Sequence, residues 1–445
     1  MPMSRRDFVK SSAGAAVVAG ITGAAAMPPR GASAAPRPSP RTRRLAPSAR
    51  LSLGFIGCGK RAFELLPAFL DRDDCVALAV CDVDTTRREH ARKMVDDRYA
   101  ALRKDGSYKA CDAFNDYRDL LARADIDAVV ITTPDHWHAA QIIDAARSQK
   151  DIYCEKPMTL TLAEGKACID AVRKHNRVFQ TGSQQRTEYD GKFRTACEYV
   201  RSGRIGKVIS VNVGVGDPPT SCDLPEEAPE PGLDWDRWLG PAPARPYCTV
   251  LSPRGVHSHY PMWRKYWEYA GGLLADMGAH HFDIAQWGLA MDASGPFQIT
   301  PPLDPAALVG ARMQYGDGTQ LFHGGPSGTT FIGTDGIIAV DRGRIHSIPD
   351  GILKEPLGPK DTHLHEAPDH ISAWIDCIHS RLRCICDVEI GARSAAVCQL
   401  ANIAYRTRKP LLWDPESWKF VGENADAGNA LATCQRRAGF ELPDA

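Results

Sequence analysis

A glycine-rich turn after a short apolar segment constrains this 445-residue chain more than any other feature. Leu51–Ile56 has the composition of a buried strand, and the next residues, Gly57-Cys58-Gly59-Lys60-Arg61-Ala62, open a helical pattern. In this context the first glycine makes the turn, and the second lets backbone amides approach a diphosphate at the helix N-terminus. The turn predicts a dinucleotide site in which Gly57, Gly59, Lys60 and Arg61 take part.

The segments after this turn alternate between strand and helix patterns, which is typical of βαβ units and a parallel sheet. We expect further strands at Val76–Cys81, Ala128–Thr132, Asp151–Cys154 and Val178–Gln180, and helices at Thr86–Val95, Ala139–Gln149 and Leu162–His175. Residues 50–182 are therefore predicted to form an N-terminal Rossmann domain, a doubly wound parallel sheet.

Beyond residue 182 the alternation gives way to longer loops rich in Pro, Trp and Gly. Strand-like runs occur at Val208–Val215, Leu308–Tyr315 and Gly336–Val340, and helical patterns at His370–Arg381 and Gly391–Arg406. The expected fold class is α/β, in which residues 183–445 form a C-terminal α/β domain with a largely open mixed or antiparallel sheet. We expect this second domain to hold the substrate.

The charge balance and the cysteine pattern exclude two classes of function. Lys and Arg number 54 and Asp and Glu also number 54, so no basic excess attracts nucleic acid. The 14 cysteines are scattered without the paired spacing of a zinc finger. We therefore expect no nucleic-acid partner and no metal, and we interpret most cysteines as small buried hydrophobes.

The N-terminus carries the pattern of an export signal. Ser4-Arg5-Arg6-Asp7-Phe8-Val9-Lys10 precedes an Ala/Gly-rich apolar run, and Ala32-Ser33-Ala34 offers a cleavage site. The run is too short and weakly apolar for a stable membrane span. We expect a twin-arginine signal at residues 1–34, a linker at 35–49 and a periplasmic or other extracytoplasmic location, with a disordered basic leader as the alternative.

The second expected strand ends at an acidic residue, Asp82. At this separation from the glycine turn, a carboxylate accepts hydrogen bonds from the adenosine ribose and disfavours a 2′-phosphate. NAD is therefore the predicted cofactor. NADP stays possible because Arg87 and Arg88 lie one turn further on.

Glu155-Lys156-Pro157 ends a later strand, at the edge of the sheet where open α/β folds bind ligands. Pro157 stiffens the chain after the lysine and helps to fix where its ammonium points. Lys156 is accordingly a catalytic candidate, and an ordinary surface lysine is the alternative.

A second cluster follows Gly271-Gly272, where helical spacing places Asp276, His280 and Asp283 on one face. An Asp–His pair four residues apart suits a general base whose carboxylate orients the imidazole. An exposed helix pair of no function is the alternative. A metal site is disfavoured because His280 and His281 point about 100° apart on a helix.

An aromatic and basic cluster precedes this helix and includes His257, Trp263 and Arg264. Such side chains suit the face and hydroxyls of a carbohydrate, although a contact between domains or subunits would use them equally well. His257, Trp263, Arg264 and Asp283 are therefore the candidate substrate residues.

Together these motifs resemble those of the Gfo/Idh/MocA family, named after glucose-fructose oxidoreductase and inositol dehydrogenase. The resemblance covers nearly all of the chain after the leader, and it also rests on Thr133-Pro134-Asp135-His136-Trp137-His138. It implies that Lys156 lies beside the nicotinamide and the substrate hydroxyl, and that Asp276 and His280 orient the substrate and take its proton. It further implies that Thr133, Pro134 and His138 line the cofactor pocket and that Glu155 lies near the nicotinamide ribose.

The chain is also similar to the exported branch of this family, through Leu233–Pro241, Gly333-Thr334-Asp335-Gly336 and Trp413-Asp414-Pro415. It departs from that branch at Gln149-Lys150-Asp151 and at Ala392, and neither departure touches the expected chemistry. We expect a homodimer or homotetramer formed through the C-terminal sheet.

Export would limit how the enzyme uses its cofactor, because free nicotinamide cofactor is scarce outside the cytoplasm. Two mechanisms regenerate a bound cofactor in place. One is oxidation of a sugar or polyol hydroxyl coupled to reduction of a second sugar; the other is redox-neutral cleavage of a glycoside through a transient keto-sugar. A non-catalytic cofactor-binding protein is a third reading, against which the set Lys156, Asp276 and His280 argues.

Overall fold

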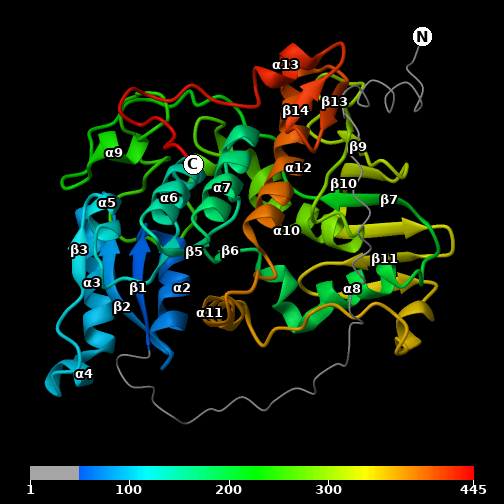
Figure 1. The fold of residues 1–445 in the computed structure, drawn as a ribbon. Coiled ribbons are helices and arrows are strands. Elements are labelled where there is room, and N and C mark those ends of the chain that lie inside the picture. Colours follow the sequence, from blue (N-terminus) through cyan, green and yellow to red (C-terminus); the bar gives the residue numbers. More distant parts are fainter. Residues whose placement is uncertain (1–49) are drawn as a thin grey trace, which may run out of the picture. The chain divides into compact units, whose positions relative to one another are not determined.

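The computed structural model describes residues 50–445 (Figure 1). The expected signal peptide and linker lie outside these residues. Within residues 50–445, no helix is both long enough and apolar enough to cross a membrane.

The N-terminal part contains a parallel sheet of six strands in the order β3-β2-β1-β4-β5-β6. This is the strand order of a Rossmann fold, and it reverses between β1 and β4. The strands are β1 (Leu51–Ile56), β2 (Cys75–Cys81), β3 (Asp112–Phe114), β4 (Ala128–Ile131), β5 (Asp151–Cys154) and β6 (Phe179–Thr181); the helices are α2 (Lys60–Leu70), α3 (Thr85–Arg98), α4 (Ala100–Lys104), α5 (Tyr117–Leu121), α6 (Asp135–Arg147) and α7 (Leu162–Lys174). The structure confirms the predicted fold and adds β3, α4 and α5.

The C-terminal part contains an antiparallel sheet in the order β12-β11-β10-β9-β8-β13-β14, with β7 paired to β10. Its strands are β7 (Val208–Gly214), β8 (Gln298–Thr300), β9 (Arg312–Gln314), β10 (Gln320–Gly333), β11 (Ile337–Val340), β12 (Ile345–Ile348), β13 (Leu411–Asp414) and β14 (Lys419–Val421). The helices are α8 (Lys192–Arg201), α9 (Trp235–Leu239), α10 (Gly272–Gly288), α11 (His370–Ser380), α12 (Val388–Thr407) and α13 (Ala425–Asn429). The expected open antiparallel sheet is confirmed.

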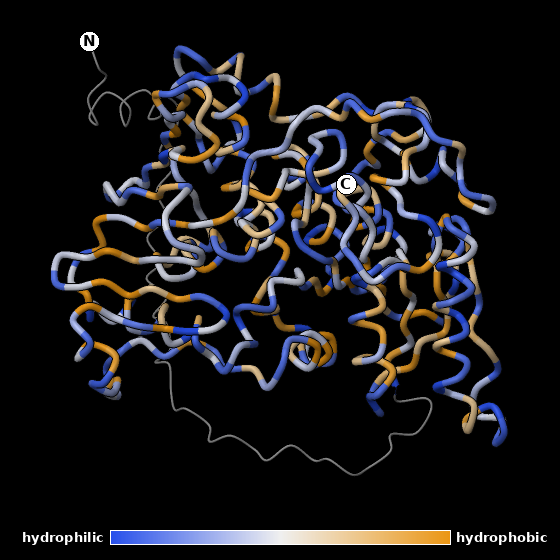
Figure 2. Tube along the Cα trace, turned by 180° about the vertical axis from the view of Figure 1, so that it is seen from behind, coloured by the Kyte–Doolittle hydropathy of each residue, from blue (hydrophilic) through white to orange (hydrophobic). Residues whose placement is uncertain are grey.

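One helix of the C-terminal part belongs to the core of the Rossmann sheet. Trp374 of α11 is fully buried, and its ring packs edge-on against Phe69 of α2 and Tyr153 of β5, at 6.0 and 5.7 Å between centroids. Figure 1 shows α11 lying beside α2. Figure 2 shows hydrophobic segments alternating with hydrophilic ones along strands and helices of both parts. The chain therefore returns to its first domain after building most of the second.

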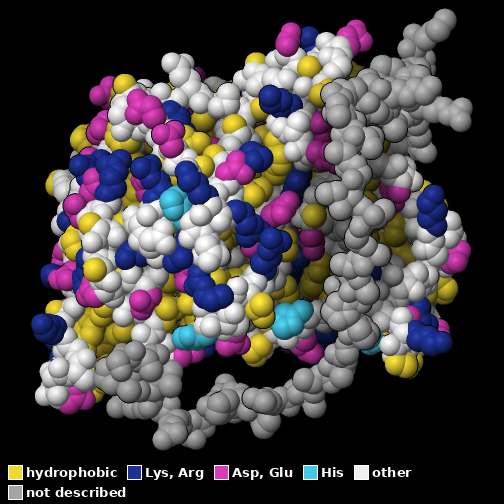
Figure 3. Space-filling view, viewed as in Figure 1, with side chains coloured by type: hydrophobic (Ala, Val, Ile, Leu, Met, Phe, Trp, Pro, Cys, Tyr) yellow, Lys and Arg dark blue, Asp and Glu magenta, His cyan; other side chains and the backbone are white. Residues whose placement is uncertain are grey.

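The surface carries both signs of charge. On the face shown in Figure 3, basic and acidic side chains lie interspersed over the described residues. Most cysteines are buried, as expected, and no disulfide joins any of them within residues 50–445.

Candidate active site

The glycine turn between β1 and α2 has the geometry that its sequence predicts. Gly57 has φ +89°, and a Cβ there would lie 2.8 Å from the backbone N of Thr133, so only glycine fits. A Cβ on Gly59 would meet nothing within 4 Å. Packing therefore does not require the second glycine, and the space in front of it is open to a ligand.

Asp82 closes this turn from the end of β2. Its two carboxylate oxygens accept hydrogen bonds from the backbone amides of Cys58 and Asp84, at 2.6 and 2.8 Å. Burial raises the pKa of Asp82, although Arg87 and these two amides oppose the effect. Asp82 thus lies in the cavity formed by the glycine turn, as predicted.

The two arginines that left NADP open are both engaged by the protein. Arg87 is buried and donates to the backbone oxygens of Pro253 and Gly255 and to the hydroxyl of Ser252. Arg88 donates to the backbone oxygen of Asp82 at 2.7 Å and to the side chain of Asn115 at 3.1 Å. Both guanidinium groups already donate to protein oxygens, so neither is available to a 2′-phosphate.

Two cavities adjoin at the carboxyl edge of the Rossmann sheet. The first, of about 270 Å³, is lined by the glycine turn, Asp82, Thr133, Pro134 and His257. The second, of about 630 Å³, is lined by Glu155, Lys156, Asp276 and His280. Both are lined by Arg61, Thr132, Thr133, Trp263 and Arg264. The two cavities thus share lining residues at the edge of the sheet where open α/β folds bind their ligands.

Lys156 and Asp276 form the centre of the second cavity. The Lys156 ammonium donates to the carboxylate Oδ1 of Asp276 at 2.8 Å and to its backbone oxygen at 2.7 Å. Arg264 approaches the same carboxylate at 3.5 Å. Burial pushes the pKa of Asp276 upward, but the two cations outweigh it and hold that pKa below its usual value. Asp276 is therefore ionised and anchors both cations.

The expected Asp276–His280 pair is wrong as a hydrogen bond. The carboxylate faces Lys156 and Arg264, and the buried Nδ1 of His280 has no hydrogen-bond partner among residues 50–445. Burial, assisted by the charges of Lys156 and Arg342, lowers the pKa of His280 well below its usual value. His280 is accordingly a neutral imidazole that lines the cavity.

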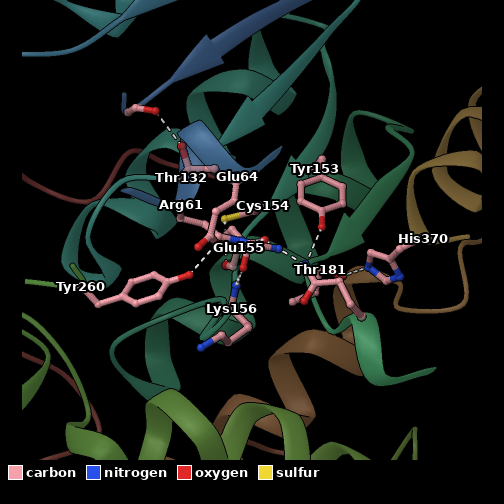
Figure 4. A network of polar contacts seen from close by, with 12 residues as sticks. Arg61, Glu64, Thr132, Tyr153, Cys154, Glu155, Lys156, Thr181, Tyr260 and His370 are labelled. Carbon is pink, nitrogen blue, oxygen red and sulfur yellow. Dashed lines mark hydrogen bonds and ion pairs between the residues drawn. The ribbon is translucent and has the colours of Figure 1, made fainter. Parts of the chain in front are cut away.

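A buried polar network supports Lys156 from the Rossmann side (Figure 4). Glu155 accepts hydrogen bonds from Arg61 and Gln184, each at 2.9 Å, and Gln184 also donates to Tyr153 at 2.8 Å. A Cβ at position 182 would lie 2.6 Å from the Glu155 carboxylate, so Gly182 makes room for it. The network leaves Glu155 little freedom and fixes the residue that precedes Lys156.

Two predicted site residues lie elsewhere. Asp283 is completely buried, where it pairs with Arg186 through two contacts of 2.8 Å and accepts from Ser394 at 2.7 Å, so its candidacy as a substrate residue is wrong. His138 does not line either cavity; it contacts the backbone oxygens of Thr133 and Pro157, each at 2.8 Å. It supports these cavity segments from behind.

Two protein-family models match this chain. One, described as "Oxidoreductase family, NAD-binding Rossmann fold", matches residues 51–183, and another, described as "Oxidoreductase family, C-terminal alpha/beta domain", matches residues 220–442. The chain belongs to the Gfo/Idh/MocA family. Oxidoreductases with a nicotinamide-binding Rossmann domain are therefore its relatives, and the predicted family and fold are confirmed.

Curated bacterial proteins align with part of the chain. "Uncharacterized oxidoreductase YrbE" of Bacillus subtilis is 28% identical, over 52% of this chain and 60% of its own length. A "Glycosyl hydrolase family 109 protein" of Shewanella baltica is 31% identical, over 46% of this chain and 44% of its own. The chain thus spans about half the length of the curated relatives it matches.

Solved structures of the family share the fold over most of the chain. The WlbA dehydrogenase of Bordetella pertussis, in complex with NADH and UDP-GlcNAcA, has a TM-score of 0.57 at 17% identity, covering 82% of this chain and 99% of its own. The scyllo-inositol dehydrogenase of Lactobacillus casei, with bound NAD(H) and scyllo-inositol, has a TM-score of 0.51 at 18% identity, covering 82% and 99%. At this identity the similarity establishes the fold.

Several cavity residues of this Gfo/Idh/MocA member were not among the predicted site residues. Asp135 begins α6 inside the motif quoted for the resemblance; burial, opposed by Arg264, raises its pKa to about 8. Tyr260 lines the second cavity and donates to Glu64 of α2, and Arg342 reaches the cavity from the β11–β12 turn. A motif could have indicated Asp135, whereas only tertiary packing brings in Tyr260 and Arg342.

Proposed function

We propose that this protein is a nicotinamide-dependent oxidoreductase that acts on a hydroxyl of a sugar or polyol, with NAD as a retained cofactor. The observation that carries the proposal is the position of Lys156, Asp276 and His280 in a cavity that adjoins the one formed by the glycine turn. In this position the cationic Lys156 and the neutral His280 can hydrogen-bond and deprotonate a hydroxyl that lies at the end of a bound dinucleotide.

The residues present fit a nicotinamide dinucleotide. Gly59 leaves open space at the start of α2, where no side chain caps the helix, and Asp82 is available for a ribose. When bound, the nicotinamide ring supplies a hydride acceptor or donor. The engagement of Arg87 and Arg88 by protein oxygens favours NAD over NADP.

The chain's own residues would manage the proton and the substrate. The Lys156 ammonium, held by Asp276, can donate a hydrogen bond to the substrate oxygen and stabilise negative charge on it. His280 is neutral, so it can accept the hydroxyl proton as the carbon is oxidised. Asp276 neither gives nor takes a proton in this scheme, because two cations keep it ionised.

The chain encloses the first cavity in a way that supports a retained cofactor. Asp236, Arg237 and Trp238 line it from α9, and Phe440 lines it from the C-terminal segment. Arg437 fastens the two together by donating to the backbone oxygens of Gly240 and Asp236. Figure 1 shows the C-terminal segment running from α13 to the α9 side of the molecule. A cofactor bound beneath this cover would leave slowly, as periplasmic use after twin-arginine export of the folded protein would demand.

The alternative function is redox-neutral cleavage of a glycoside through a transient keto-sugar. It is supported by relatives such as the "Alpha-N-acetylgalactosaminidase" of Shewanella oneidensis, 30% identical over 46% of this chain and 44% of its own length. The same three residues would serve, since oxidation next to a C–H bond acidifies it and permits elimination.

One experiment tests the proposal and separates the two functions. Mass spectrometry of the purified protein under native conditions identifies the bound cofactor, and absorbance at the reduced nicotinamide band follows a panel of sugars and polyols. Net oxidation changes the absorbance and produces a keto-sugar. Glycoside cleavage instead leaves the cofactor oxidised and, in deuterated water, introduces deuterium beside the transiently oxidised carbon. A protein without bound nicotinamide that also fails to bind added NAD contradicts both.

A further inference from the structure

The mouth of the Lys156 cavity holds a cation without an acidic partner. Arg342 lies on the turn between β11 and β12 and lines the cavity, and no carboxylate oxygen of residues 50–445 lies within 4.0 Å of its guanidinium as an ion-pair partner. In contrast, Lys156 and Arg264 share Asp276, and Arg61 pairs with Glu155. Arg342 thus differs from the other cations of this cavity.

Contacts with uncharged groups position this guanidinium. Its centre lies 5.1 Å from the ring centroid of Tyr189, and its Nε donates to Oε1 of the buried Gln185 at 3.3 Å. The two Nη groups have no hydrogen-bond acceptor within the described part of the chain. An arginine held through the face of its guanidinium and its Nε presents the two Nη groups as a fork for a carboxylate or a sulfate.

Four cationic side chains and four carboxyl groups line the cavity: Arg61, Lys156, Arg264 and Arg342, and Asp135, Glu155, Glu188 and Asp276. Asp276 and Glu155 pair with the other cations, and Glu188 accepts a hydrogen bond from the backbone amide of His370 at 3.2 Å without a cationic partner among the described residues. Burial raises the pKa of the Asp135 carboxyl to about 8. The charge of Arg342 also contributes to the lowered pKa of His280, after burial and Lys156. Its field therefore reaches the residue proposed to take the substrate proton.

We propose that Arg342 binds an anionic substituent of the substrate, so that the Lys156 site acts on acidic sugars that carry a carboxylate or sulfate at a distance from the oxidised hydroxyl. This inference rests on the proposed function and names its substrate class. The two Nη groups of Arg342 would bind the anion at the mouth of the cavity, while the reacting hydroxyl lies at Lys156 and His280. Neutral sugars would lack this anchor.

The test compares acidic sugars with their neutral parents on the holoenzyme. D-Glucuronate, D-galacturonate and D-glucose 6-sulfate are the acidic probes, and D-glucose and D-galactose are the parents. Titration calorimetry measures binding, and cofactor absorbance measures turnover. The variants are R342Q and R342K, with R344Q as the matched control, because Arg344 lies on the same turn but pairs with Asp341 and does not line the cavity.

We expect the wild type to bind at least one acidic probe about tenfold or more tightly than its parent, as charge-assisted hydrogen bonds commonly provide. R342Q should abolish that preference by weakening the binding of acids far more than that of their parents, R342K should retain part of it, and R344Q should match the wild type. Whichever acid class shows the larger loss in R342Q identifies the anion as carboxylate or sulfate.

Equal loss for acidic and neutral probes in R342Q, or no Arg342-dependent binding of any acidic probe, overturns the inference. Oxidation of neutral parents alone also overturns it and leaves the proposed oxidoreductase function intact. Arg342-dependent binding of an acid with neither cofactor turnover nor glycoside cleavage would support anion binding by Arg342 alone, and would count against the proposed function and against acidic sugars as its substrates.

Discussion

The ammonium of Lys156 binds Asp276 twice, through the carboxylate at 2.8 Å and through the backbone oxygen at 2.7 Å. The second contact is to the main chain of helix α10, so the lysine is tied to the helix as well as to its side chain. One N–H of the ammonium remains for a ligand. This pair joins the Rossmann domain to the second domain at the point where chemistry is proposed.

Replacing either partner of this pair should remove turnover but not the cofactor. Lys156→Ala and Asp276→Asn should each lower kcat by about 10²-fold or more, since each loses the positioned ammonium. Bound cofactor, measured by absorbance of the purified protein, should remain at wild-type stoichiometry. Lys93→Ala, which removes an exposed lysine paired with Asp97, is the control. Near-normal kcat in Lys156→Ala would exclude the lysine from the reaction.

Two adjacent histidines provide a matched comparison. His280 lines the Lys156 cavity, whereas His281 contacts the hydroxyl of Thr329 at 3.2 Å and lines a separate, smaller cavity. His280→Ala should lower kcat by about 10²-fold, and His281→Ala should leave it within a few-fold of the wild type. The reverse pattern would place the proton acceptor on the other histidine.

The pH profile of the wild type should reflect the buried state of His280. Burial and the charge of Lys156 lower its pKa, so the imidazole stays neutral to well below pH 6.5. The acidic limb of kcat/KM should therefore have its midpoint below 6.5. Arg342→Gln removes one charge that lowers this pKa and should shift the midpoint upward. A limb at or above 6.5 in the wild type would contradict a neutral buried His280.

Asp135 should destabilise the fold as pH rises. Its folded pKa of about 8 exceeds the value of an exposed aspartate, so the unfolded chain loses this proton first, and stability falls between about pH 4 and pH 8. Asp135→Asn should raise the free energy of unfolding by on the order of 5 kcal/mol at pH 8 and by little near pH 4. Denaturant titrations at both pH values measure this, with the exposed Asp125→Asn as control. A gain independent of pH would mean that Asp135 is ionised in the fold.

Phe440 should slow cofactor release. Its ring packs edge-on against Trp137 at 5.8 Å between centroids, beneath the guanidinium of Arg437. Phe440→Ala should accelerate dissociation by about tenfold, because an aromatic pair contributes about 1 kcal/mol and truncation also removes buried area. The rate follows from cofactor lost after rapid desalting. Asp444→Asn, four residues after Phe440 and outside the cavity lining, should behave as the wild type.

The Rossmann strands could be predicted because buried parallel strands are continuous apolar runs, and Leu51–Ile56 and Asp151–Cys154 match to the residue. β3 was missed, since its three residues pair only at the sheet edge. The longest strand, β10, was also missed. Its centre is Gly324-Gly325-Pro326, which resembles a loop, and β7 pairs with the strand on both sides of it.

The sequence predicts which residues line the site better than it predicts which of them interact with one another. Helical spacing correctly places Asp276 and His280 in one cavity, but it does not reveal what packs opposite. The carboxylate instead meets Lys156, 120 positions earlier in the chain. For the same reason the prediction of Asp283 as a substrate residue was wrong. Only the folded structure shows that Arg186 lies opposite Asp283 and pairs with it. The export signal stays a prediction.

Because α11 packs on the Rossmann sheet, the first domain depends on the second for part of its core. A fragment that ends after β6 would lack Trp374 and would expose the faces of Phe69 and Tyr153 that the indole covers. A chimera that joins this Rossmann sheet to a different second domain would expose the same aromatic surface unless that domain supplied an equivalent helix.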